Sequence, residues 1–255
     1  MTRLLASVRT ADEALAALAG GADILDLKEP AAGALGRLPD AAIRGILAAV
    51  AGQRPTSATI GDMALAPEPV SAAVAAMAAL GVDIVKIGIF AGDLGATLAA
   101  LAPLARRHPL VAVVFADRSP EAALVARFAG AGFHGVMLDT AEKAAGPLTR
   151  HLPLAFLRDF VARAQGAGMI AGLAGSLAVQ DVAALAPLGP DYLGFRSALT
   201  RGGRAGPLDP AAVRRVRVAL DQASASSSAT AAAGAQSAAS SARAGEAGMS
   251  AAKLV

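Results

Sequence analysis

The stretch that decides the fold reads GGADILDLKEP and covers residues 20–30. Two glycines form a turn, a short apolar strand follows at Ile24–Lys28, and the strand ends on charged side chains. An alanine-rich segment with the composition of a helix, residues 11–19, precedes the turn. A short buried strand between helices is typical of a parallel sheet whose crossover connections are helical.

The same unit recurs along most of the chain. Short β-branched apolar runs alternate with alanine-rich segments, several of which open with proline or an acidic residue, as helix starts favour. We expect eight strands: Leu4–Val8, Ile24–Lys28, Thr56–Gly61, Ile84–Ile89, Leu110–Asp117, Gly135–Asp139, Met169–Ala174 and Tyr192–Ser197. Eight strand–helix units predict an α/β protein with a single (β/α)8 TIM barrel over residues 1–222. An open doubly wound sheet is the alternative, but no G-x-G-x-x-G sequence follows the first strand.

The composition suits such a barrel and excludes several classes of protein. Of 255 residues, 55% are hydrophobic and only 3% aromatic, so the core must consist of alanine, valine, leucine and isoleucine. The absence of cysteine excludes disulfides and thiolate sites and is compatible with a reducing cytosol. The start lacks the apolar run of a signal peptide, and no apolar stretch approaches the ~20 residues of a membrane span. We therefore expect a cytoplasmic protein without a membrane partner.

The charge favours small anionic substrates over nucleic acid. The pI is about 9.8, but the net charge is only +3 and the basic residues are dispersed. No aromatic side chains are interleaved with them for base stacking, so we expect no nucleic-acid partner. A homo-oligomer is compatible with a barrel of this size.

The end of the chain differs from the rest. Residues 223–255 are rich in alanine, serine and glycine and have almost no large apolar side chains. Such a segment buries too little surface to offset its ordering entropy, so we expect a disordered tail.

Lysine is rare, and its positions are informative. Four of the 23 basic residues are lysines; Lys28, Lys86 and Lys143 lie at or near expected strand ends, and Lys253 lies in the tail. Arginine cannot replace lysine where a neutral amine attacks a carbonyl, because the guanidinium group stays protonated. Chance is the alternative explanation, but the pattern favours amine chemistry.

The neighbouring residues place these lysines inside the barrel. Side chains two apart on a strand share a face, so Asp26 and Lys28 would point inward together if their apolar neighbours face the helices. The same argument puts Lys86 inside and Asp139 at the inner end of its strand, with Lys143 on the loop that follows. Chemistry in these barrels occurs at the carboxyl ends of the strands.

A mouth with several ammonium and carboxylate groups is electrostatically balanced, whereas isolated buried lysines would be costly. Clustered ammonium groups also lower one another's pKa and so increase the fraction of nucleophilic amine. Salt bridges that merely close the barrel top are the alternative, which accounts less readily for three lysines from different strands.

Two further segments have the character of anion sites. GLAGSL at residues 172–177 lies at the end of the seventh expected strand, and GFRS at residues 194–197 ends the eighth. Loops at these positions often bind phosphate through backbone N–H groups and a helix N-terminus. The candidate phosphate-binding residues are Gly172, Gly175, Ser176, Gly194, Arg196 and Ser197.

The remaining polar residues receive no assigned role. Asp62 and Asp117 end or follow strands, and His151 lies in a long connection. His108 and His134 precede strands and so belong to the opposite face of the barrel. No spacing resembles a metal site and no Ser-His-Asp arrangement is evident, so we expect neither a metal nor another cofactor.

The chain resembles the (5-formylfuran-3-yl)methyl phosphate synthase family from about Leu4 to Leu220. The most specific match is the stretch at residues 20–30, followed by GALG at 33–36. DIVKIG at 83–88, GVMLDT at 135–140 and GLAGSL at 172–177 also match. The resemblance implies a TIM-barrel lyase of methanofuran biosynthesis, a pathway of methanogens and methylotrophic bacteria.

The resemblance also implies a reaction and roles for individual residues. The family condenses two glyceraldehyde 3-phosphates to 4-(hydroxymethyl)-2-furancarboxaldehyde phosphate, with loss of phosphate and water. Lys28 would form the Schiff base and Lys86 would be the proton acceptor. Asp26, Asp139 and Lys143 would support them.

Two other functions remain compatible with the residues. A Schiff-base aldolase that acts on another sugar phosphate would need the same lysines and phosphate loops. A non-catalytic barrel that binds a phosphorylated metabolite would form no covalent adduct.

Overall fold

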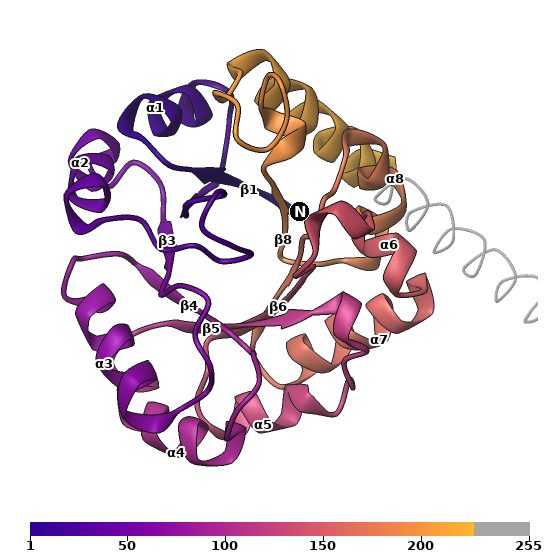
Figure 1. Ribbon diagram of the computed structural model, residues 1–255. Helices are drawn as coiled ribbons and strands as arrows, with labels where there is room; N and C mark the ends of the chain where they lie inside the picture. The colour runs from indigo at the N-terminus through magenta and orange to yellow at the C-terminus, as the bar shows by residue number, and fades with distance from the viewer. Residues whose placement is uncertain (227–255) are drawn as a thin grey trace, which may run out of the picture.

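A computed structural model describes residues 1–226, which form a closed barrel of eight parallel strands in the order β1 to β8 (Figure 1). The strands are β1 Arg3–Val8, β2 Ile24–Leu27, β3 Thr56–Thr59, β4 Ile84–Gly88, β5 Leu110–Phe115, β6 Gly135–Asp139, β7 Ile170–Leu173 and β8 Tyr192–Phe195. The barrel confirms the predicted (β/α)8 fold. Several strands end one or two residues earlier than expected, so Lys28 and Arg196 stand just beyond β2 and β8.

Helices surround the barrel on its outside (Figure 1). They are α1 Ala11–Ala19, α2 Asp40–Val50, α3 Pro67–Ala78, α4 Leu94–Ala105, α5 Leu124–Gly130, α6 Leu148–His151, α7 Leu154–Gly166, α8 Val182–Leu185 and a last helix over 210–226. The last helix includes residues 223–226, which the composition assigned to the tail. The rest of the expected tail, 227–255, lies outside the described residues.

The first helix shows how the sequence sets the local structure. The hydroxyl of Thr10 caps α1 by accepting a hydrogen bond from the Glu13 N–H at 3.2 Å. The turn after α1 needs glycine, because a Cβ at Gly20 would lie 2.4 Å from the Val213 Cβ. The last helix therefore packs directly against the turn that leads into β2.

The core has two parts. The larger one lies between the strands and the helices, and a smaller one fills the inside of the barrel with Leu5, Ile24, Val111, Met137 and Tyr192 among its members. Along β2 and β4 the inward positions change from apolar to charged toward the carboxyl ends. The strand register places the hydroxyl side chains of Ser7 and Ser57 on either side of Asp26 and pairs Lys86 with Thr59.

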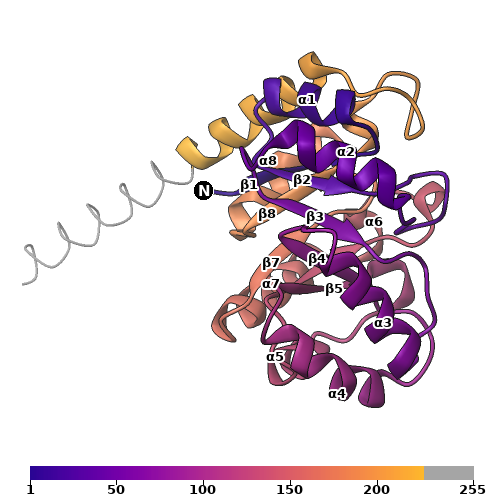
Figure 2. The same ribbon diagram turned by 90° about the vertical axis from the view of Figure 1, so that its left-hand side faces the viewer.

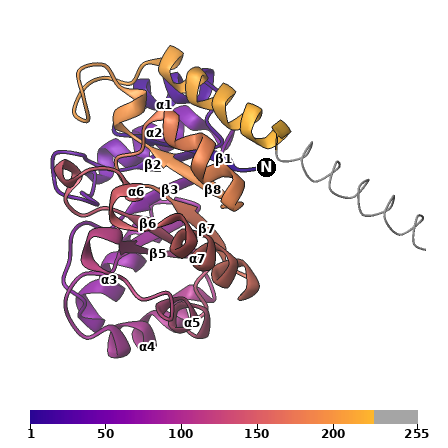
Figure 3. The ribbon, with the colours of Figure 1, turned by 90° about the vertical axis from the view of Figure 1, so that its right-hand side faces the viewer.

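The two ends of the barrel differ. In Figures 2 and 3 the N-terminus lies at one end, while the indigo loop after β2 and the orange loop before the last helix project from the other. The polar ends of the strands open toward these loops. Among the helices described, none is long and apolar enough to cross a membrane.

Candidate active site at the carboxyl ends of the strands

Asp26 is the buried centre of the site. Its Oδ1 accepts hydrogen bonds from Lys86 Nζ at 2.9 Å and Ser57 Oγ at 2.7 Å, and its Oδ2 accepts one from Ser7 Oγ at 3.3 Å. Burial alone would raise the pKa of Asp26, but the charges of Lys86 and Lys28 outweigh burial and lower it. The carboxylate is therefore ionised and holds the two lysines on one side of the barrel.

Lys86 lies below the surface, with 1% of the residue exposed. Burial lowers the pKa of its ammonium group, Lys28 lowers it further, and Asp26 opposes both effects. Phe90 and Leu35 cover the next inward position on β4, because a Cβ at Gly88 would lie 2.3 Å from Phe90 and 2.8 Å from Leu35. Asp26 lines the cavity and Lys86 does not, so Asp26 connects Lys86 to the open part of the site.

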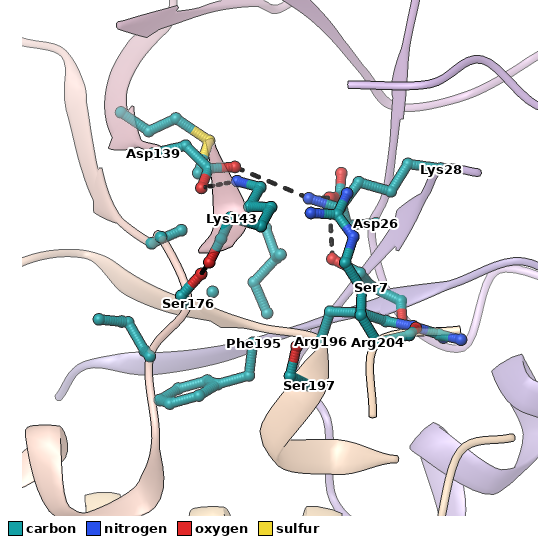
Figure 4. Close-up of a pocket in the computed structure, with 16 residues that line it drawn as sticks. Ser7, Asp26, Lys28, Asp139, Lys143, Ser176, Phe195, Arg196, Ser197 and Arg204 are labelled. Carbon is teal, nitrogen blue, oxygen red and sulfur yellow. Dashed lines mark hydrogen bonds and ion pairs between the residues drawn. The ribbon is translucent and has the colours of Figure 1, made fainter. Parts of the chain in front are cut away.

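Lys28 lies between two carboxylates from different strands. Its Nζ is 3.8 Å from Asp26 Oδ2 and 3.7 Å from Asp139 Oδ2 (Figure 4). Both distances exceed hydrogen-bond length, and no other described residue accepts a hydrogen bond from this Nζ. Lys28 also lines the cavity at the barrel mouth. It is a buried amine held by charge but not tied by a hydrogen bond.

Asp139 and Lys143 form the opposite wall (Figure 4). Lys143 Nζ lies 2.5 Å from Asp139 Oδ1 and also donates to the Thr140 carbonyl. Burial would raise the pKa of Asp139, but Lys143 and Lys28 bring it down to about 2. Burial and the nearby Lys28 lower the pKa of Lys143 to about 8, against the effect of Asp139. Burial is thus the main cause of the lowered pKa of Lys86 and of Lys143, and the nearby charge of Lys28 lowers both further.

The structure brings five of the six candidate phosphate residues to the same cavity: Gly175, Ser176, Gly194, Arg196 and Ser197. The Ser176 hydroxyl donates to the Lys143 carbonyl at 3.0 Å, which joins the β7 loop to the β6 loop. The backbone N–H groups of Gly175, Ser176 and Leu177 donate to no acceptor among the described residues. They are available to an anion.

Gly172 lies elsewhere. It points into the barrel below the cavity, where a Cβ would lie 2.3 Å from the Tyr192 ring. Its lack of a side chain makes room for that ring, which explains the glycine by packing.

Arg196 has a different environment from the one its sequence position indicates. Its Nη1 and Nη2 donate to the two Glu13 oxygens at 2.6 and 3.1 Å. The remaining N–H groups donate to three carbonyls, those of Ser7, Arg204 and Gly206, at 3.1, 2.9 and 2.9 Å. Every N–H of the guanidinium group thus has a protein partner, whereas we expected it to supply charge to a phosphate.

Sequence reasoning missed three residues of the site. Ser7 and Ser57 could have been found from their inward positions on β1 and β3, because a polar side chain there needs a partner. Arg204 also lines the cavity, and it reaches the cavity from a loop beyond the eighth expected strand. Only the glycines at 202 and 203 mark that loop in the sequence.

The two aspartates without an assigned role hold loops in place. Asp62 accepts hydrogen bonds from the N–H groups of Ala34 and Leu35 at 2.9 and 2.7 Å. Asp117 accepts from those of Ala141 and Glu142 at 2.9 and 2.7 Å. The buried His151 Nε2 has no partner among the described residues. Within the same part of the chain, no group of three potential metal ligands occurs.

The chain is similar in sequence to known proteins of one family. The model of the 4-HFC-P synthase family matches residues 4–217. A putative (5-formylfuran-3-yl)methyl phosphate synthase of Methylorubrum extorquens is 46% identical over 201 residues, which are 78% of this chain and 83% of that protein. The (5-formylfuran-3-yl)methyl phosphate synthase of Methanosarcina mazei is 33% identical over 217 residues, covering 79% and 92%.

Solved structures match the fold alone. Phosphoribosyl anthranilate isomerase from Thermus thermophilus superposes with a TM-score of 0.63 at 18% identity, covering 87% of this chain and 99% of that one. A thiamine phosphate pyrophosphorylase from Pyrococcus furiosus gives a TM-score of 0.62 at 12% identity, covering 87% and 96%.

Proposed function

The chain belongs to the 4-HFC-P synthase family, and from this we propose that it forms (5-formylfuran-3-yl)methyl phosphate from two molecules of glyceraldehyde 3-phosphate. The same compound is 4-(hydroxymethyl)-2-furancarboxaldehyde phosphate, and its formation releases phosphate and water. The reaction is that of a lyase, and we place it in methanofuran biosynthesis. Like the sequence resemblance, the proposal invokes no cofactor.

The observation that carries the proposal is the position of Lys28. A Schiff-base lysine must reach the substrate, become a neutral amine and have groups nearby that exchange protons with it. Lys28 lines the cavity, and carboxylate oxygens lie 3.7 and 3.8 Å from its Nζ without a hydrogen bond to it. No other described lysine combines these properties, because Lys86 and Lys143 both donate to carboxylates.

The first steps follow from this arrangement. The Lys28 amine adds to the aldehyde of one substrate, and loss of water gives an iminium ion whose neighbouring C–H is acidic. Lys86, whose pKa burial lowers, is the base that we assign to this proton. Asp26 contacts both amines, 2.9 Å from Lys86 and 3.8 Å from Lys28, and is placed to relay the proton.

The later steps use the other wall of the site. The enamine adds to the aldehyde of the second substrate, and ring closure with elimination of phosphate and water gives the furan. Asp139 and Lys143 lie where they can exchange protons with these intermediates. Formation of the aromatic ring makes the sequence effectively irreversible.

We place one substrate phosphate at the free N–H groups of Gly175, Ser176 and Leu177, beside Gly194 and Ser197. The cavity between these groups is lined by Lys28, Asp139, Lys143 and Arg204, so the bound phosphate would lie beside the amine that we assign to the Schiff base.

The test is to incubate the protein with glyceraldehyde 3-phosphate and follow furan absorbance and phosphate release, with Lys28→Arg as the control. Furan formation that Lys28→Arg abolishes supports the proposal. A covalent adduct without furan would indicate an aldolase instead. The absence of both furan and adduct would contradict an enzymatic role on this substrate and would favour a barrel that only binds a phosphorylated metabolite.

A further inference from the structure

The loop between β8 and the last helix is a closed hairpin at the barrel mouth. An isolated bridge pairs Thr200 with Leu208, and the Arg201 N–H donates to the Pro207 carbonyl at 3.0 Å. A Cβ at Gly206 would lie 1.7 Å from the Arg201 carbonyl oxygen, so the hairpin closes tightly on itself. Arg204 lies within it and lines the cavity.

Arg196 fixes this hairpin to the barrel. Two of its N–H groups donate to the carbonyls of Arg204 and Gly206, and the Glu13 carboxylate of α1 holds the other side of the guanidinium group. Arg196 and Glu13 are both buried. The backbone position of Arg204 therefore depends on an ion pair outside the lysine cluster.

Arg204 differs from the other cations around the cavity. Lys28, Lys143 and Arg196 each have a carboxylate within 4 Å, whereas Arg204 forms no ion pair with a described residue. Its Nη2 donates to the Gly33 carbonyl at 3.0 Å, and its buried Nε has no acceptor. A half-buried guanidinium group that lines a cavity and forms no ion pair with a described residue is a site for an anion.

The charges around Arg204 agree with this. Burial lowers the pKa of its guanidinium group, Asp139 opposes burial, and Arg196, Asp62 and Glu29 act on it as well. Asp62 and Glu29 are already occupied by backbone N–H groups. Near the cavity, Lys28, Lys143 and Arg204 face Asp26 and Asp139, and Lys86 adds a further ammonium group behind Asp26.

We propose that Arg204 binds the phosphate group of the substrate, and that Arg196 and Glu13 are positioning residues that hold it over the cavity. The proposal rests on the proposed function for the identity of the substrate. A guanidinium group offers two parallel N–H donors to phosphate oxygens, which complements the single N–H groups of the β7 loop. Arg204 thus takes the part that the sequence position of Arg196 indicated.

The test compares two aldehydes, glyceraldehyde 3-phosphate and glyceraldehyde, at concentrations below saturation. The rate of borohydride-trapped adduct on Lys28 is measured for the wild type, Arg204→Gln and the matched control Arg201→Gln. Arg201 lies on the same hairpin with its side chain exposed. We expect Arg204→Gln to slow trapping of the phosphorylated aldehyde about tenfold to a hundredfold and that of glyceraldehyde less than about twofold. Arg201→Gln is expected to change neither rate.

An equal loss with both aldehydes, or no loss with glyceraldehyde 3-phosphate, would overturn the role of Arg204. Inorganic phosphate provides a readout that does not need the reaction. Its dissociation constant, measured by calorimetry, should rise about tenfold or more in Arg204→Gln and be unchanged in Arg201→Gln. If the wild type forms no adduct with either aldehyde, the proposed function fails, while this phosphate measurement still decides the role of Arg204.

The positioning role is tested with Glu13→Gln, after its melting curve shows a folded protein at the assay temperature. We expect weaker phosphate binding and no further weakening when Arg204→Gln is added, because both changes remove the same contact. Additive losses would contradict the positioning role. If Glu13→Gln does not fold, Arg196→Lys, which keeps the charge but loses the paired donors, replaces it.

Discussion

Two buried clusters of charge lie at the same end of the barrel and differ in how fully they are satisfied. Around Arg196, every N–H group has an acceptor, and Glu13 is held on both oxygens. Around Lys28, two carboxylates lie just beyond hydrogen-bond length. The first arrangement fixes a loop to the barrel. The second leaves an amine that can react.

The difference follows from the free energy of burial. A buried ion is costly unless its partners replace the water that it loses. Arg196 has such partners and gains rigidity. Lys28 has partial compensation only, which leaves its Nζ without a hydrogen bond that a covalent bond to substrate would have to replace. Hydrogen-bond satisfaction thus separates the two cations more clearly than burial does.

The largest expected effect is on turnover at Lys28. Lys28→Arg keeps a positive charge but removes the nucleophile, so kcat should fall by about 10⁴-fold or more, as for other covalent catalysts. Furan formation under saturating substrate measures this. Phosphate affinity in the same variant serves as the control and should stay close to that of the wild type. Retention of substantial turnover would show that another group forms the covalent bond.

The second effect contrasts the stabilities of the two clusters. Arg196→Met leaves the buried Glu13 with only Arg9, a partly exposed cation 3.2 Å away, and removes the donor of three carbonyls. It should therefore lower the free energy of unfolding by about 3–5 kcal/mol. Lys28→Met removes an ammonium group without hydrogen bonds, and Asp26 and Asp139 keep Lys86 and Lys143, so it should cost little or nothing. Denaturant unfolding measures both. Equal destabilisation by the two substitutions would refute the comparison.

The third effect is a pH dependence that originates at Lys143. Its pKa is about 8 in the folded protein and about 10.5 in an unfolded chain, so the unfolded state binds more protons between these values. The contribution of Lys143 to stability is therefore unfavourable at pH 8 and below, and the penalty disappears as pH rises toward 10.5. The slope should be at most about 1.4 kcal/mol per pH unit. Lys143→Gln should remove this slope from the unfolding free energy; an unchanged slope would assign it to another group.

The smallest effect lies below both clusters, at the packing of Tyr192. Gly172→Ala places a methyl group where the ring lies and should destabilise the barrel by about 1–3 kcal/mol. Gly166→Ala is the matched control, because no atom lies within 4 Å of a Cβ there and alanine favours α7. Thermal unfolding of the two variants separates them. Equal melting temperatures would mean that Tyr192 does not need the space at Gly172.

The barrel and the lysine–aspartate cluster can be predicted from the sequence, whereas the ion pair of Arg196 with Glu13 cannot. Alternation along β2, β4 and β6 predicts which side chains point inward, so the barrel and the lysine–aspartate cluster follow from local pattern. The partner of Arg196 does not, because Glu13 is 183 positions away in the chain and lies on a helix whose pattern gives no sign of a buried ion pair. Gly172 illustrates a further limit: a glycine that makes room for a ring and one that exposes N–H groups look the same in sequence.

The most direct test of the account is to map the borohydride-trapped adduct by mass spectrometry after reaction with glyceraldehyde 3-phosphate. Lys28, Lys86 and Lys143 are all buried or partly buried near the same carboxylates, and only Lys28 lacks a hydrogen bond at its Nζ. We predict substrate mass on the peptide that contains Lys28 and on neither of the peptides that contain Lys86 and Lys143. An adduct on Lys86 or Lys143 with Lys28 unmodified would contradict it.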